Sequence, residues 1–253
     1  MVLVDAARFA VGTLTAVPVA PPRVVDRRVA LTGLLLAPLA VVPLGLLVTA
    51  VLFLGRELGL ASLALGVAAT AALALGSRAF HLDGLADTAD ALTSSYDRDR
   101  ALAVMKRGDT GPAGAAALAL TLGVQAASFA SLALWQWGPV LAGALVCASR
   151  IAPALLCSRG LPAARPDGLT ASYAGTLHPG VPLAAWTALA ALLAAVTALT
   201  GLGWWRGVVC ALVGLVLVAA LARRAMRRLG GVTGDIHGAA IEIALAGMLL
   251  AAT

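Results

Sequence analysis

Long apolar runs separated by short polar connections dominate this chain. A helix needs about 20 predominantly apolar residues to cross the roughly 30 Å hydrocarbon core of a bilayer. Seven stretches approach that pattern: residues 29–54, 58–77, 113–134, 138–157, 181–201, 207–222 and 235–252. We therefore predict an all-α fold, a polytopic integral membrane helical bundle with about seven transmembrane helices, and treat residues 1–253 as a single membrane domain.

Two features at the start of the chain modify this pattern. Pro38 and Pro43 lie inside the first apolar run, which membrane helices tolerate when neighbouring groups satisfy the freed carbonyls. Residues 2–17 space their apolar side chains at helical intervals but contain Asp5 and Arg8, which argue against a cleavable signal peptide. A short interfacial helix and a flexible tail are both compatible with this segment.

The composition excludes most soluble classes of protein. Hydrophobic residues make up 61% of the chain and charged residues only 12%, whereas soluble domains carry about 25% charged residues. The three cysteines, Cys147, Cys157 and Cys210, stand in apolar runs without a CxxC pair, so we interpret them as small buried hydrophobic residues.

The distribution of positive charge predicts the topology. A net charge of +6 would suggest nucleic-acid binding in a soluble protein, but here the arginines lie in short connections between apolar runs. One set of connections is rich in basic residues: Arg8, Arg23, Arg27 and Arg28; Arg78, Arg98, Arg100, Lys106 and Arg107; Arg159 and Arg165; Arg223, Arg224, Arg227 and Arg228. The alternate connections carry only Arg56 and Arg206. The positive-inside rule then predicts a cytoplasmic N-terminus and an external C-terminus. Because membrane topology accounts for the arginines, we expect membrane lipid around the chain and no nucleic-acid partner.

Half of the acidic residues lie in one window of the second connection. Six of the twelve fall between Asp83 and Asp109, and the stretch F-H-L-D-G-L-A-D-T-A-D-A-L spaces Asp83, Asp87 and Asp90 at i, i+4 and i+7. On an α-helix these three side chains share one face, which predicts a cytoplasmic amphipathic acidic helix whose like charges repel one another. A bound Mg²⁺, which prefers oxygen ligands, would offset the repulsion. The alternative is a solvated face neutralised by Arg78, Arg98 and Arg100.

The rest of this connection, about 78–112, suggests a place for phosphate. We expect a second short helix over 97–107, ended by Gly108. The following K-R-G-D-T-G-P-A-G run lets backbone amides approach an anion, while Lys106, the only lysine, and Arg107 supply cationic donors. Asp109 could be a further metal ligand or a helix cap. These features predict a cytoplasmic catalytic connection.

Polar residues also occur at membrane depth. Asp235 and Glu242 stand two turns apart on the last apolar run, which favours a second acidic contribution to the same cytoplasmic pocket over capping alone, although Thr233 or Asp235 could cap the helix. Arg150 lies in the fourth run, where it could snorkel to the interface, neutralise Glu242 or hold a phosphate. His81 adjoins the acidic helix as a general base, a phosphate donor or an ordinary interface histidine.

Several of these motifs resemble one known family. The stretch from Phe80 to Leu92 closely resembles the signature of cobalamin synthase, the adenosylcobinamide-GDP ribazoletransferase. Arg8-Phe9 with Thr13-Leu14-Thr15 and Pro18 is similar to the family's opening, and Gly230 to Glu242 is similar to its closing segment. One departure is that many members place an Asp directly after the lysine of the loop, where this chain has Arg107 and then Asp109 two positions further on.

The resemblance implies an integral enzyme of the cell membrane that depends on Mg²⁺. It would join adenosylcobinamide-GDP to α-ribazole or its 5′-phosphate and release GMP, with a homo-oligomer possible. The metal ligands would be Asp83, Asp87 and Asp90, with Asp109 as a further candidate. Phosphate oxygens would be held by Lys106, Arg107 or Arg150, and the base would be Asp90 or His81. A CDP-alcohol phosphotransferase-like enzyme and an ion-coupled transporter remain as alternatives.

Overall fold

The backbone is helical throughout its regular parts. The computed structural model describes residues 1–253, apart from the side chain of Leu169, and the described residues form isolated β-bridges rather than strands. The helices, in chain order, are α1 (Val2–Leu14), α2 (Arg27–Ala40), α3 (Val42–Glu57), α4 (Ser62–Gly76), α5 (Phe80–Ser94), α6 (Arg98–Val104), α7 (Pro112–Ala133), α8 (Gly138–Ser149), α9 (Ala152–Leu156), the 3-10 helix η1 (Leu169–Ser172), α10 (Gly180–Leu199), α11 (Trp204–Leu229) and α12 (Gly234–Ala252).

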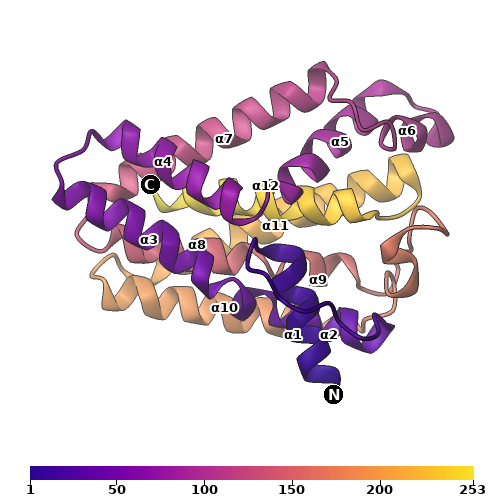
Figure 1. Ribbon diagram of the computed structural model, residues 1–253, viewed down its shortest axis with the longest axis horizontal. Coiled ribbons are helices and arrows are strands. Elements are labelled where there is room, and N and C mark those ends of the chain that lie inside the picture. Colours follow the sequence, from indigo (N-terminus) through magenta and orange to yellow (C-terminus); the bar gives the residue numbers. More distant parts are fainter.

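The long helices run along the molecule's longest axis (Figure 1). Helices α8 and α12 bury most of their residues, whereas α7, α10 and α11 bury about a third of theirs or less. The exposed residues of these outer helices include Leu120, Leu192 and Val216. Exposure of these apolar side chains to water would be unfavourable, whereas lipid solvates them. Six helices are long and apolar enough to cross a bilayer, or seven if a bent pair counts as one span, so the predicted multi-pass membrane fold is confirmed.

The first predicted span is interrupted. The 29–54 run forms two helices, α2 and α3, that meet at Val41. Pro43, at the start of α3, has no N–H to donate to the carbonyl four residues earlier, and its ring crowds that carbonyl, so the helix cannot continue unbroken. Together the two helices still form one apolar segment from Arg27 to Glu57.

The second predicted span also differs from expectation. Helix α4 has only 15 residues, and the chain then turns by 94° into α5. Arg78 and Ala79 adopt left-handed backbone conformations at the turn, with φ of 57° and 54°, which costs a non-glycine residue about 1–2 kcal/mol. The amide of Ala16 donates to the carbonyl of Gly76 at 2.6 Å, and Arg78 donates to the carbonyl of Gly12. The end of α1 therefore holds the bend in place.

The N-terminal segment is a helix that packs on α2 rather than a flexible tail. Phe9 and Ala10 are buried, and the carboxylate of Asp5 accepts the backbone N–H of Arg23 at 3.2 Å. Of the two readings of residues 2–17, the helical one is confirmed.

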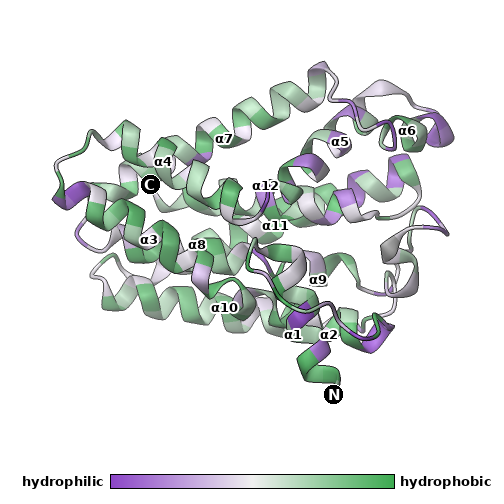
Figure 2. Cartoon of the chain, in the orientation of Figure 1, coloured by the Kyte–Doolittle hydropathy of each residue, from purple (hydrophilic) through white to green (hydrophobic). Residues whose placement is uncertain are grey.

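Polar residues gather at one end of the bundle (Figure 2). We call this the polar end and define it by α5, α6, the last turns of α11 and the 157–179 connection. At the opposite end, the Arg56 guanidinium donates to the carbonyl of Trp135 at 2.8 Å, and Arg206 stacks on the Trp135 ring. The connections predicted to share one side of the membrane therefore do lie together, whereas the assignment of the polar end to the cytoplasm stays a prediction.

Candidate active site

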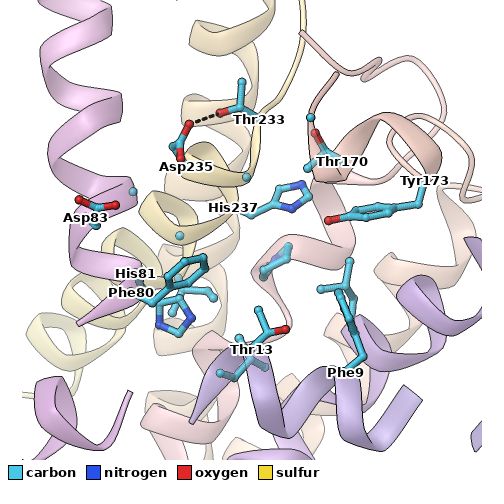
Figure 3. Close-up of a pocket in the computed structure, with 18 of the residues that line it drawn as sticks. Phe9, Thr13, Phe80, His81, Asp83, Thr170, Tyr173, Thr233, Asp235 and His237 are labelled. Carbon is cyan, nitrogen blue, oxygen red and sulfur yellow. Dashed lines mark hydrogen bonds between the residues drawn. The ribbon is translucent and has the colours of Figure 1, made fainter. Parts of the chain in front are cut away.

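A cavity of about 290 Å³ lies at the polar end, where the first turns of α5 and α12 meet α1 and the 157–179 connection. Its volume is close to the lower limit of small-molecule pockets, about 300 Å³. Figure 3 shows Asp83 and Asp235 on one side of this cavity and Phe9 and Tyr173 on the other. The cavity thus has a polar wall with two carboxylates and an aromatic, largely apolar wall.

The polar wall depends on a close crossing of α5 and α12. A Cβ added at Gly84 would lie 2.7 Å from the carbonyl oxygen of Asp235, so no larger residue fits without moving a helix. Thr233 caps α12, its hydroxyl accepting the N–H of Ile236 at 3.3 Å, and that hydroxyl also lies 3.2 Å from the Asp235 carboxylate. The crossing brings Asp235 to the same cavity as Asp83.

Asp87 lies one turn after Asp83 and is half-buried. The negative charges of Asp83, Asp235 and Asp90 act on it, and the positive charge of Arg165 opposes them. Among the described residues, no three Asp, Glu, His or Cys side chains are arranged as a complete metal site. The carboxylates near Asp87 therefore create a negative potential suited to a cation, and water or a ligand would have to supply the remaining coordination.

Asp90 has a different set of partners. One carboxylate oxygen accepts the N–H of Gly111 at 2.7 Å and the other accepts the N–H of Gly114 at 2.9 Å. Gly111 is the N-cap residue of α7 and Gly114 lies in its first turn, where N–H groups have no partner within the helix. The anion approached by this glycine-rich run is therefore Asp90 itself. The roles of metal ligand and base predicted for Asp90 remain untested, but both of its oxygens are already engaged.

A buried polar cluster, made of His81, Gln125, Arg150 and Glu242, lies beside the cavity. The amide of Gln125 donates to Glu242 at 2.7 Å, and His81 Nδ1 lies 3.8 Å from the other Glu242 oxygen. Arg150 is fully buried and interacts electrostatically with Glu242, so it does not snorkel to the interface. Of the described members of the cluster, only His81 lines the cavity.

The loop residues predicted to hold phosphate do not line the cavity, as far as the described side chains show. Lys106 Nζ lies 2.8 Å from the Asp167 carboxylate, and this exposed ion pair joins two connections of the polar end. The Lys106 ammonium holds the pKa of that carboxyl below its usual range. Arg107 and Asp109 border a separate shallow surface hollow beside the start of α7. Asp97 caps helix α6 and accepts the N–H of Arg100 at 2.8 Å. The helix ends at Val104, earlier than predicted, and the predicted turn follows at Gly108.

Comparison with known proteins shows the family to which this chain belongs. Residues 6–253 match the family model described as cobalamin-5-phosphate synthase. The chain belongs to this family. It is 53% identical over 247 residues to an adenosylcobinamide-GDP ribazoletransferase of Nocardioides sp., covering 98% of this chain and 97% of that protein. It is 34% identical to an adenosylcobinamide-GDP ribazoletransferase of Frankia casuarinae, covering 96% and 92% of the two chains. No solved structure matches the chain.

Membership in the cobalamin-5-phosphate synthase family confirms the resemblance drawn from residues 80–92 and from the two ends of the chain. The matched region contains the whole of α5 and α12 together with the 157–179 connection. The cavity is therefore built entirely from segments that the family shares.

The cobalamin-5-phosphate synthase fold also brings in residues that sequence reasoning missed. In the sequence, Arg165 stands out only as a positive charge that predicts membrane orientation. In the structure this residue lines the cavity, and its charge acts on both Asp87 and Asp235. Its Nε has no hydrogen-bond partner among the described residues, while one terminal nitrogen donates to the carbonyl of Leu102 at 3.2 Å. The sequence feature that could have indicated this role is the position of Arg165 in the longest connection of the polar end, directly before a proline.

Two aromatic residues of the cavity were likewise not predicted. The rings of Tyr173 and His237 stack, with their centroids 6.1 Å apart and their planes 29° apart. Burial raises the pKa of the Tyr173 phenol well above its usual range, so this side chain stays neutral. His237 lies in the closing segment from Gly230 to Glu242, whereas Tyr173 stands in no recognisable sequence pattern. Their contact could not be predicted, because it depends on how the 157–179 connection folds over α12.

Proposed function

We propose that this chain transfers the cobinamide phosphate of adenosylcobinamide-GDP to α-ribazole, or to α-ribazole 5′-phosphate, and releases GMP. The transfer breaks the phosphoanhydride bond to GMP and forms a phosphodiester with a ribose hydroxyl, whose proton passes to a base. The observation that carries this proposal is a cavity lined by Asp83, Asp235 and Arg165 in a chain of the cobalamin-5-phosphate synthase family. Acidic and cationic groups in one cavity suit a reaction that moves charge between phosphate oxygens.

The donor set of the polar wall fits Mg²⁺. This ion prefers oxygen ligands and usually takes one or two carboxylates, several waters and substrate phosphates. Asp83 and Asp235 would hold it, Asp87 would add negative charge one turn further along α5, and when bound the ion would neutralise charge on the leaving phosphate. Arg165, whose Nε has no partner among the residues that the structure describes, would bind a phosphate oxygen beside it.

His81 is our candidate for the base. It lines the cavity, and in the described part of the chain neither of its ring nitrogens has a hydrogen-bond partner. Glu242, 3.8 Å from Nδ1, would favour the tautomer with the proton on Nδ1 and leave Nε2 free to accept the proton of the ribose hydroxyl. Gln125 and Arg150 would keep Glu242 oriented from within the bundle.

We further propose that the polar end faces the cytoplasm and that the protein resides in the cell membrane. The concentration of arginines on that side supports this orientation through the positive-inside rule. A homo-oligomer remains a prediction from the resemblance.

Release of GMP from adenosylcobinamide-GDP by washed membranes tests the function. With α-ribazole present we expect GMP and the coupled corrinoid in equal amounts. EDTA should abolish both products, and added Mg²⁺ should restore them. Membranes that lack the chain are the control. No turnover with either form of ribazole would refute the transferase assignment, whereas turnover that resists EDTA would refute only the Mg²⁺ requirement.

A further inference from the structure

The wall of the cavity opposite the carboxylates is built from rings. Phe9 projects from α1, and the stacked pair of Tyr173 and His237 joins the 157–179 connection to α12. Figure 3 shows these three side chains together, away from Asp83. Leu14 and Leu34 complete the apolar surface. A wall of this kind contributes little to binding phosphate but offers planar faces for an aromatic ligand.

One polar atom in this wall lacks a partner. His237 is only 7% exposed, and its Nε2 has no hydrogen-bond partner among the described residues. A buried donor or acceptor left unpaired is unfavourable, so such atoms often await a ligand. Because the ring lies against Tyr173 and lines the cavity, a ligand that enters the cavity can reach this nitrogen.

We infer that the wall formed by Phe9, Tyr173 and His237 binds the heteroaromatic base of the acceptor nucleoside, an inference that rests on the proposed function. A benzimidazole-type base linked to ribose through one ring nitrogen keeps a single unsubstituted nitrogen, which can accept one hydrogen bond. His237 Nε2–H supplies one donor in otherwise apolar surroundings. Guanine presents several donors and acceptors, and the ring wall would leave most of them unpaired.

The size and the polarity of the cavity support the same assignment. A volume of about 290 Å³ suits a nucleoside but not a corrin macrocycle, which must stay outside and extend only its phosphate-bearing arm inward. With the base against the rings, the ribose would point toward His81 and Asp83, where the phosphoryl group arrives. The ring wall would thus orient the attacking hydroxyl.

The KM for α-ribazole, measured by GMP release at saturating adenosylcobinamide-GDP, tests the hydrogen bond. His237→Phe keeps a ring in place but removes the donor, and it should raise this KM about tenfold. A ribonucleoside of indole, which lacks the second nitrogen, should have a KM about tenfold above that of α-ribazole in the wild type. In His237→Phe this difference should disappear, a result that a merely structural role of His237 would not produce.

Phe9→Leu tests the stacking contact and should raise the α-ribazole KM about fivefold. Phe53→Leu is the matched control, since Phe53 is an exposed residue of α3 that stacks on Arg56. If the variants raise the KM for adenosylcobinamide-GDP instead, the ring wall binds guanine and the inference is wrong. Unchanged KM values for both substrates would also overturn it while leaving the transferase function intact. A wild type without turnover would overturn both.

Discussion

Asp83 and Asp90 stand at the two ends of the acidic stripe of α5 (Asp83, Asp87 and Asp90), and their surroundings differ. Asp83 is exposed and lines the cavity. Asp90 is only 8% exposed, and its two oxygens accept amides from the first turn of α7. The same residue type, on the same helix face, thus meets a cavity at one end and a helix terminus at the other.

This difference comes from the neighbours of α5. Near its start, the close approach of α12 at Gly84 adds a second carboxylate and leaves both open to the cavity. Near its end, α7 begins with unpaired N–H groups and a partial positive charge, which a carboxylate satisfies. The helical period places the three aspartates together, but the packing of α7 and α12 decides which of them remain available for chemistry.

The largest expected effect is on catalysis at the cavity end of the stripe. Asp83→Asn keeps the size of the side chain but removes its charge, so it should lower kcat for GMP release about 10²- to 10³-fold. Thermal unfolding in detergent should stay unchanged, because Asp83 is exposed. Activity within twofold of wild type would show that the open carboxylate is not used.

At the other end of the stripe, substitution of Asp90 should mainly change the stability of the protein. Asp90→Ala leaves two amides of α7 unpaired in a buried place and should lower the free energy of unfolding by about 2–3 kcal/mol. Asp90→Asn, which keeps one acceptor oxygen, should lose less. Denaturant titration in detergent measures both, with activity normalised to folded protein. A stable Asp90→Ala variant with no activity would instead restore the predicted catalytic role of Asp90.

Gly114→Ala probes the cap without changing Asp90. A Cβ at this position would collide with the Asp90 carboxylate and with the carbonyl of Ala86. We expect a loss of about 1–3 kcal/mol of stability, the usual cost of overpacking. Gly123→Ala in the same helix is the matched control, since nothing lies within 4 Å of the added Cβ. Equal stability of the two variants would contradict the cap geometry.

Much of the fold could be predicted because its signals are local. The apolar runs predicted most of the spans, although the first is broken at Val41 and the second ends in a bend. Asp97 correctly marked the cap of α6, and Gly108 marked the turn that follows it. The turn at Arg78 and Ala79 could not be predicted, since neither residue favours a left-handed conformation. Contacts from α1 hold that turn, and no local pattern reports contacts so distant in sequence.

The candidate site could be predicted only in part, for the same reason. Asp83, Asp87 and Asp235 were recognisable as acids in a chain that has few of them. Arg165 and His237 were not assigned to the site, because their places depend on how a connection folds over α12. Loop residues such as Lys106 and Arg107 had the right chemistry for phosphate but face outward.

The smallest effect is expected outside the stripe, at Lys106. Its ion pair with Asp167 is exposed, and such pairs contribute little in water and salt. The pKa of the Asp167 carboxyl is lowered, so the ion pair is present at neutral pH. The pair is lost only when the pH falls through this lowered pKa and the carboxylate is protonated. Lys106→Gln and Asp167→Asn should each leave the KM for adenosylcobinamide-GDP within about twofold of wild type at neutral pH. A tenfold rise in Lys106→Gln alone would mean that the lysine leaves Asp167 to bind substrate phosphate, and that the working site extends from the α5 carboxylates to this loop.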